Sequence, residues 1–370
     1  MGRAQAQEGR GDEATAAWTD AAAVARRRDQ SRPTATVRIG VLVNGRADGG
    51  RAEQLRALAG VLPDGGAGAT FAATRSLDEL PSAVGRLLVH GGVNVLALVG
   101  GDGTVHHAVN ALLALEAASA ARHGPTPLPR LLLLGGGTLN IVARTTGVHG
   151  RPRRRLRHFL RYFDGTPLSR VPARRLDTMT VRSPGTPDRH GFVFGSEVLH
   201  HAIALYVRFG AGYGGLGRFL FELARGATLG SALWREESWR LGPFGSVLEV
   251  DGRRFEPYTA VVASSVDLTL AVGGVRAIRR PLHAPGFFTK VVLEHEPMRV
   301  LQMVPALMRE ARHPGVVDLP EAKRMRLAGP YTLDGELFGH AERAGPRAPL
   351  DVAEGPRVYA VPGELGAMRW

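Results

Sequence analysis

A glycine-rich segment directly after an apolar run is the clearest chemical signal in this sequence. Residues 93–99 read VNVLALV, and Gly100-Gly101-Asp102-Gly103-Thr104 follows at once. Glycines let the backbone approach a ligand closely, and a helix beginning here would point free N–H groups and its positive dipole end at that ligand. A carboxylate at Asp102 could hold Mg²⁺ against bound phosphates. The segment predicts a phosphate-binding loop, and the alternative is a plain strand-to-helix turn.

A second glycine-rich segment has the same context. Gly135-Gly136-Gly137-Thr138-Leu139-Asn140 follows the apolar residues 131–134 and precedes a helical pattern. Ligands of doubly wound sheets bind beyond the carboxyl ends of the strands, so the two loops are expected to line one crevice. A P-loop needs Gly-Lys-Ser/Thr, and neither Lys290 nor Lys323 follows a glycine. The letters G-x-G-x-x-G at residues 210–215 lie outside the strand–helix alternation and are interpreted as a chance match.

The elements that must position these loops alternate between strand and helix. Short apolar runs at 37–43, 70–74, 93–99 and 131–134 are separated by helical patterns at 51–62, 76–89 and 104–118, and another helix begins in 140–146. This alternation predicts a parallel sheet covered on both faces. After about residue 166 strand-like runs follow one another, at 177–182, 191–194, 246–250, 258–263 and 289–293, with helical patterns only at 217–233 and 298–311. A mainly antiparallel second domain is therefore expected.

These patterns give the domain bounds. Residues 1–33 have little apolar content and are expected to be a disordered lead-in. Residues 34–166 are assigned to an α/β nucleotide-binding domain, to which residues 342–370 return through a strand at 357–361. Residues 167–341 are assigned to the second, mainly antiparallel domain.

Composition restricts the remaining possibilities. The 370 residues include no cysteine, which excludes disulfides and thiolate chemistry, and carry a formal net charge of +13. No run of 18 apolar residues occurs, so no membrane span is expected, and no secretory signal is seen at the N-terminus. Basic charge favours an anionic partner, but no aromatic–basic interleaving supports nucleic acid. Six arginines between residues 151 and 161 indicate either a solvated helix face or a contact with anionic lipid; they are Arg151, Arg153, Arg154, Arg155, Arg157 and Arg161.

Taken together, the motifs resemble the diacylglycerol kinase catalytic family, which includes sphingosine, ceramide and bacterial lipid kinases. Residues 100–104 match the family's G-G-D-G-T, and residues 135–140 with Ala143 are similar to its second loop. Asp334-Gly335-Glu336 looks like its late D-G-E motif. NAD kinases share the first motif, so the combination is what indicates the lipid kinase branch. The resemblance runs from about Val37 to the C-terminus.

The resemblance implies a nucleotide domain and a β-sandwich domain with the active site in the cleft between them. It implies ATP contacts at Asn44, Thr74, Gly101, Asp102, Gly103, Thr104 and Thr138, and Gly100, Gly137 and Asn140 complete the expected nucleotide-binding set. It also implies that Glu336, with Asp334, accepts the proton of a lipid hydroxyl, a role that suits a carboxylate within hydrogen-bond reach. Two residues apart, these carboxylates would share one face of an extended segment. Without the glycine loops, Asp-Gly-Glu would be interpreted as a solvated turn.

Three departures from the family pattern stand out, and one is in the second loop, where Gly136 stands in place of the usual Pro and Leu139 in place of a common Gly. Asn44 is followed by Gly45-Arg46-Ala47-Asp48-Gly49, which lacks the Pro and Ser of the family's first loop. Pro285-Gly286 stands where the family carries an Asp-Gly pair tied to a structural Mg²⁺, so the carboxylate of that pair is missing here.

The sequence therefore predicts an ATP- and Mg²⁺-dependent lipid kinase that moves the γ-phosphate to a primary hydroxyl of diacylglycerol, ceramide or a sphingoid base. Expected partners are ATP, a lipid alcohol and an anionic membrane surface, with no nucleic acid and with a homodimer left open. The expected location is the cytoplasm, in peripheral association with a membrane. Two alternatives remain: an NAD-kinase-like enzyme, in which D-G-E has no role, and a catalytically weak lipid- or nucleotide-binding protein, which the altered first loop motivates.

Overall fold

The computed structural model describes most of the chain. The described residues are 20–45, 58–61, 69–137, 140–210, 247–269, 276–280, 284–307, 313–339, 347–365 and 368–369, with 215, 218–219, 221–222, 225–226 and 235–236. The chain divides into two compact units, one formed by Met1–Leu176 with Arg357–Trp370 and the other by Asp177–Pro356. Both divisions fall inside long strands, β5 (Arg174–Arg182) and β18 (Pro349–Ala360), whereas the sequence analysis drew the domain bounds after residues 166 and 341.

The first unit is built on a parallel sheet. Its strands run in the order β2 (Ala69–Thr74), β1 (Ile39–Asn44), β3 (Val95–Gly100) and β4 (Arg130–Gly135), and all neighbouring pairs are parallel. Ala360, the last residue of β18, then pairs in parallel with Leu131 of β4. The predicted parallel sheet and the predicted return of the C-terminal strand are therefore confirmed.

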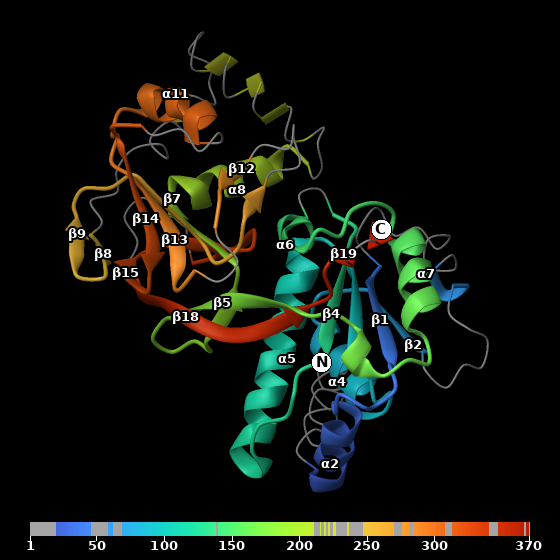
Figure 1. The fold of residues 1–370 in the computed structure, drawn as a ribbon. Helices are drawn as coiled ribbons and strands as arrows, with labels where there is room; N and C mark the ends of the chain where they lie inside the picture. Colours follow the sequence, from blue (N-terminus) through green and yellow to red (C-terminus); the bar gives the residue numbers. More distant parts are fainter. Residues whose placement is uncertain are drawn as a thin grey trace, which may run out of the picture. The chain divides into compact units, whose positions relative to one another are not determined.

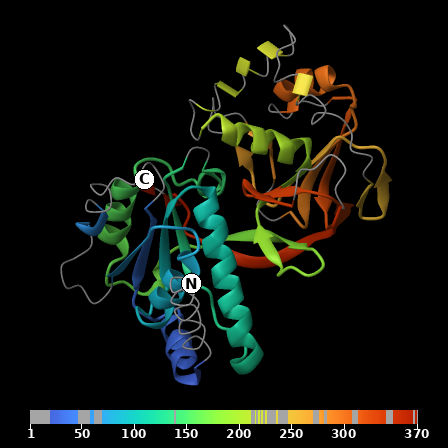
Figure 2. The same ribbon diagram turned by 180° about the vertical axis from the view of Figure 1, so that it is seen from behind.

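Helices cover both faces of this sheet. Alternate strand residues such as Val41, Ala97 and Leu132 pack in one cluster with the buried side chains of α7 (Pro152–Phe163). The residues between them, such as Leu42, are equally buried and face the other way. Helices α4 (Leu80–Val89) and α5 (Asp102–His123) contact each other and the strands, and Figures 1 and 2 show α5 and α7 on opposite sides of the strands. Strands buried on both faces account for the continuous apolar runs in the sequence.

The expectation of a disordered lead-in is wrong for residues 20–33. Residues Ala21–Gln30 form helix α2, which contacts α4 and α5. Val24 and Arg27 are almost fully buried, and the Arg27 guanidinium donates to the carbonyl oxygens of Val93 at 2.5 Å and Pro127 at 3.2 Å. Burial lowers the pKa of Arg27 to about 10. The prediction of disorder was based on low apolar content, which treats charged side chains as solvated. It failed because the charged Arg27 side chain is buried and holds the helix by hydrogen bonds. Residues 1–19 lie outside the described part.

The second unit is built from antiparallel strands. One sheet has the order β14 (Val316–Ala322), β13 (Phe287–Val292), β10 (Ala260–Ser264), β7 (Val193–Glu197), β16 (Tyr331–Leu333) and β17 (Glu336–Phe338), with every neighbouring pair antiparallel. Strand β18 pairs antiparallel with β15 (Arg324–Ala328), which continues to β8 (Leu248–Val250) and β9 (Arg253–Phe255). One hydrophobic cluster takes side chains from both groups of strands. The predicted mainly antiparallel second domain is confirmed.

Shorter elements complete the described part. They are α6 (Ile141–Thr145), the 3-10 turn η2 (Leu168–Arg170), β6 (Arg189–Gly191), α8 (Val198–Arg208), β11 (Leu268–Thr269), β12 (Arg276–Ile278), α11 (Pro297–Leu307), β19 (Glu364–Leu365) and β20 (Met368–Arg369). The helix expected at 51–62 and the helical pattern at 217–233 lie mostly outside the described residues. None of the helices described is both long and apolar enough to cross a membrane.

Candidate active site

The carboxyl edge of the parallel sheet gathers the predicted nucleotide-binding residues of the first unit. The strand register places Asn44 beside Thr74 and Gly100 beside Gly135. The Asn44 amide donates to the Thr104 hydroxyl at 3.0 Å, and the Gly45 N–H donates to the Thr74 carbonyl at 2.8 Å. Thr104 and Thr74 are both buried, so their hydroxyls lie inside the protein at this edge of the sheet. The structure thus brings the first loop and the G-G-D-G-T loop together, as the strand order predicts.

The two glycine loops pack directly against each other, backbone to backbone. The Gly136 N–H donates to the Gly100 carbonyl at 2.8 Å. A Cβ atom on Gly137 would lie 2.5 Å from the Cα of Gly101, a separation that real Cβ atoms do not show. Close approach of the two loops therefore requires a glycine here independently of any ligand. The sequence suggested phosphate approach as the reason for these glycines, and the structure adds this second one.

Asn140 shapes the second loop from its far end. Its backbone is left-handed, with φ 49° and ψ 45°, a region that Asn tolerates well. Its side-chain oxygen accepts the Gly137 N–H at 2.8 Å, and its amide donates to the Gly137 carbonyl. Thr138 and Leu139 between them lie outside the described residues. Asn140 thus folds the loop on itself immediately before α6.

The G-G-D-G-T loop ends in the first turn of the longest described helix. Asp102 is the first residue of α5, which has 22 residues, and its Oδ1 accepts the Val142 N–H of α6 at 3.2 Å. The first N–H groups of a helix lack intrahelical acceptors and carry the positive end of its dipole. The amides of Asp102, Gly103 and Thr104 are therefore a donor set that fits phosphate oxygens.

The same position was predicted to hold Mg²⁺. In the residues described, no group of three or more His, Cys, Asp or Glu side chains converges as a metal cage. Mg²⁺ at nucleotide sites is commonly held by one or two carboxylates plus phosphate oxygens and water. A single carboxylate at Asp102, beside amides that suit phosphate, fits this pattern.

In the second unit, Asp334-Gly335 forms the tight turn between β16 and β17. Leu333 pairs with Glu336, and both turn residues have positive φ, 54° at Asp334 and 90° at Gly335. These are the features of a two-residue type I′ hairpin. The expectation that Asp334 and Glu336 share one face of an extended segment is wrong, because the chain reverses between them.

The Asp334 carboxylate holds this turn against the neighbouring strands. Asp334 is 7% exposed, and its Oδ1 accepts the N–H groups of Phe192 at 2.8 Å and Val193 at 2.9 Å. The Asp334 N–H in turn donates to the Val193 carbonyl at 2.8 Å. Charge-assisted bonds to backbone amides are stronger than neutral ones. This geometry gives Asp334 a structural role at the turn.

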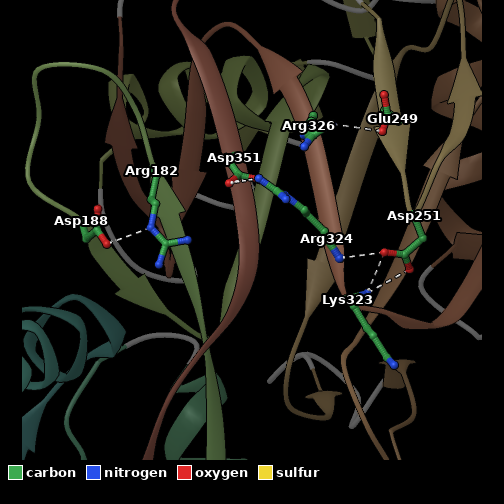
Figure 3. A network of polar contacts seen from close by, with 8 residues as sticks. All are labelled: Arg182, Asp188, Glu249, Asp251, Lys323, Arg324, Arg326 and Asp351. Atoms are coloured by element: carbon green, nitrogen blue, oxygen red, sulfur yellow. Dashed lines mark hydrogen bonds and ion pairs between the residues drawn. The ribbon is translucent and has the colours of Figure 1, made fainter.

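A second Asp-Gly turn in the same unit has the same geometry but is not followed by a glutamate. Asp251 and Gly252 have φ 47° and 83° between β8 and β9. The Asp251 carboxylate accepts the N–H groups of Lys323 at 3.0 Å and Arg324 at 2.9 Å (Figure 3). In that turn the next residue is Arg253, where the first turn has Glu336. The Asp-Gly pair is thus a turn device that this fold uses twice, and Glu336 is the residue that distinguishes the candidate site.

Glu336 stands at the start of β17, half-buried. Two residues further on, Phe338 carries the Arg189 guanidinium over its ring, 4.6 Å from the ring centre. Arg189 also donates to the Tyr331 hydroxyl at 3.2 Å. A cation therefore lies over the same edge strand as Glu336. Sequence analysis missed Arg189 and Tyr331, and no spacing signal marks one arginine among so many.

The predicted arginine cluster lies on the outer face of α7. Leu156, Phe159, Leu160 and Phe163 are its buried side chains. Five of the six arginines are exposed: Arg151, Arg153, Arg154, Arg157 and Arg161. Burial, followed by the charges of Arg155, Arg161 and Arg154, lowers the pKa of the His158 imidazole. Positive charge thus accumulates on this face, which we call the α7 basic face.

Comparisons with known proteins give one family match and several similar folds. Residues 38–163 match the family model described as "Diacylglycerol kinase catalytic domain". Among curated proteins none matches the chain. Two solved structures from Bacillus anthracis str. Sterne, each described as "a putative diacylglycerol kinase", are similar at TM-scores of 0.57 and 0.59, with 15% and 16% identity. Each alignment covers 88% of this chain and 97% of the other, and at such identity the similarity concerns the fold. Residues 38–163 thus match the diacylglycerol kinase catalytic domain model, and the two solved structures share the fold of most of the chain.

Proposed function

We propose that this protein is an ATP-dependent lipid kinase that phosphorylates a primary hydroxyl of a lipid. The observation that carries the proposal is the family match over residues 38–163, which spans both glycine loops and the first turn of α5. The Asp334–Glu336 turn, outside that match, supplies a half-buried carboxylate at a strand edge. An acceptor alcohol needs such a group to take its proton.

The first unit would bind the nucleotide. The amides of Asp102, Gly103 and Thr104 would receive phosphate oxygens, and Asn44, held by Thr104, would lie beside them. The Asp102 carboxylate would hold Mg²⁺, whose charge offsets the charge of the transferring phosphoryl group when bound. The glycine loops would keep this edge rigid, because their backbones are in direct contact.

The second unit would supply the base. Glu336 would accept the proton of the lipid hydroxyl, while Asp334 fixes the turn through Phe192 and Val193. Arg189, over Phe338, would add positive charge near the reacting oxygens. The expected cleft between the two domains stays a prediction.

The α7 basic face supports a second part of the proposal, peripheral binding to anionic membranes. Its five exposed arginines carry charge that an anionic bilayer would attract, at about 1 kcal/mol for each residue near the surface. A lipid alcohol resides in a bilayer, so such binding would deliver the enzyme to its substrate.

The decisive experiment is a screen with radiolabelled ATP. Purified protein would be incubated with mixed vesicles containing diacylglycerol, monoacylglycerol, ceramide or a sphingoid base, and with NAD. We expect label in one lipid class and none in NAD. Asp102→Asn is the matched control, because an amide oxygen still accepts the Val142 N–H while the charge for Mg²⁺ is lost. Transfer to NAD would favour the NAD-kinase alternative, and ATP binding without transfer to any lipid would favour a binding protein.

A further inference from the structure

A buried arginine in the second unit donates hydrogen bonds to three backbone carbonyl groups. The Arg280 side chain follows β12 and is 7% exposed. Its Nη1 donates to the Ser265 carbonyl at 3.0 Å, and its Nη2 donates to the carbonyls of Ala284 and Gly286. The Arg280 backbone N–H donates to the Asp267 carboxylate at 2.6 Å. Two loops that are separate in sequence, 265–267 and 284–286, are thus joined through one guanidinium.

The oxygens around Arg280 are of the kind that a hard divalent cation takes. Backbone carbonyls and a carboxylate are typical ligands of Ca²⁺ and Mg²⁺. Here the three carbonyls accept hydrogen bonds from a planar guanidinium with several donors, and the Asp267 carboxylate accepts the Arg280 backbone N–H. Pro285, between the two residues Ala284 and Gly286 whose carbonyls accept from Arg280, offers no carboxylate. Within the described residues, no cluster of three acidic or histidine side chains marks a metal cage at this turn.

The structural Mg²⁺ that the family resemblance implies therefore does not fit these residues. Its expected place is the turn at Pro285-Gly286, where the Arg280 guanidinium already binds the flanking carbonyl oxygens. A divalent ion placed there would have to displace or face a positive charge in a largely buried site. Two positive charges that share the same carbonyl oxygens repel strongly where water is excluded.

We propose that Arg280 is a built-in cation that replaces a structural divalent metal in this unit. One guanidinium would do what a metal does elsewhere, which is to draw carbonyl oxygens of two loops to a common centre. The turn it stabilises is tightly constrained, because Gly286 has φ 71° and its N–H donates to the Glu354 carboxylate at 2.7 Å. The second unit then keeps its shape without divalent metal.

Arg280 is also linked to the candidate base. The Ser265 N–H donates to the Phe192 carbonyl at 2.9 Å, and the Phe192 N–H donates to Asp334 Oδ1 at 2.8 Å. Arg280 thus acts on the Asp334 turn through two residues and is a positioning residue for Glu336. This second half of the inference rests on the proposed kinase function, and the first half does not.

The first test is thermal unfolding without nucleotide. The wild-type protein would be compared in excess MgCl₂, in CaCl₂ and in EDTA, and the same series repeated with Asp102→Asn to remove the nucleotide-site carboxylate. We expect the same Tm in all three solutions. A ligand that binds only the folded state raises Tm, so a rise with either metal in Asp102→Asn, reversed by EDTA, would overturn the proposal.

The second test removes the cation. Arg280→Ala should lower Tm, and methylguanidinium at concentrations far below the denaturing range should restore part of the loss. Arg279→Ala is the matched control. The Arg279 side chain, next to Arg280 in sequence, is exposed, so its removal should leave Tm unchanged. Equal Tm values for the two variants, or no effect of methylguanidinium on Arg280→Ala, would contradict the proposal. If Arg280→Ala does not fold, Arg280→Lys, which keeps a cation with fewer donors, should fold with a Tm below that of the wild type, and an unchanged Tm would contradict the proposal.

The third test separates positioning from stability. In Arg280→Ala, kcat for the lipid should fall at least tenfold while KM for ATP stays unchanged, and methylguanidinium should restore kcat together with Tm. Restored Tm without restored kcat would refute the positioning role and leave the structural one. The double variant Arg280→Ala/Pro285→Asp removes the guanidinium and adds a carboxylate, so its Tm should rise with Mg²⁺. A Tm that does not change with Mg²⁺ would contradict the inference that these carbonyl oxygens suit a metal.

Discussion

The two carboxylates of the Asp334–Glu336 turn should respond very differently to removal of their charge. Asp334→Asn keeps an oxygen that can accept the N–H groups of Phe192 and Val193. Asn also suits the left-handed backbone of this position, where φ is 54°. Glu336→Gln keeps size and polarity but cannot accept a proton near neutral pH. The first change should therefore preserve both turn and activity, and the second should preserve only the turn.

The magnitudes follow from these contacts. Asp334→Asn exchanges charge-assisted hydrogen bonds for neutral ones, a loss of about 1–2 kcal/mol in the free energy of unfolding. Asp334→Ala leaves two amides without their acceptor, at about 1–3 kcal/mol each, and places Ala in a left-handed conformation. It should lose at least about 3 kcal/mol, a large part of the stability of a typical domain. Glu336→Gln should lower kcat by ~10²–10⁴-fold, the usual value of general-base catalysis.

The assay measures kcat, KM for ATP and the free energy of unfolding for all three variants under one set of conditions. Asp251→Asn is the matched control, because the turn is the same and no glutamate follows it. We expect Asp334→Asn to stay within about tenfold of the wild-type kcat, whereas Glu336→Gln falls well below it with KM for ATP unchanged. A Glu336→Gln enzyme with near-native kcat would refute the assignment of the base. Loss of kcat in a stable Asp334→Asn would instead show that the Asp334 charge takes part in the chemistry.

Three further changes test other parts of the structure. Gly137→Ala should separate the two glycine loops and weaken ATP binding about tenfold or more, whereas Gly315→Ala, where a Cβ meets only ordinary contacts, should be neutral in a nucleotide titration. Replacing Arg153, Arg154 and Arg157 with Gln should abolish the preference for anionic vesicles in sedimentation, and salt should do the same to the wild type because exposed charges are screened over ~10 Å at 0.1 M; equal binding before and after would refute a role for the α7 basic face. Deleting residues 1–33 should lower Tm by several degrees, at roughly 2–4 °C for each kcal/mol, because Val24 and Arg27 leave a buried site, and an unchanged Tm in a thermal scan would contradict the packing of α2.

Local patterns in the sequence determined the first unit well. The apolar runs that end in Gly100 and Gly135 predicted two neighbouring parallel strands with loops at one edge, and the register Gly100 to Gly135 confirms them. These signals are short-range, because a buried parallel strand is a continuous apolar run and its loop follows within a few residues. The two glycine motifs of the family resemblance lie in the same segments.

Roles that depend on distant partners could not be obtained in this way. Asp334 was expected to act beside Glu336, but its carboxylate binds amides about 140 positions earlier in the chain. Arg27 looked like part of a disordered segment and instead binds a carbonyl 66 positions away. In both cases the residue type is compatible with several roles, and the groups that it binds in the folded protein determine which role it has.

Arg280 shows the same division most clearly. The sequence by itself determined that Pro285-Gly286 stands where the family resemblance implies an Asp-Gly pair, so the carboxylate of that pair is missing. Only the tertiary structure decided what takes its place, because the carbonyls of Ser265, Ala284 and Gly286 meet at the guanidinium through the folding of two loops. Carbonyl groups are present at every residue, so no sequence pattern indicates where three of them will converge. Their need for donors once they are buried is the physical reason that an arginine lies there.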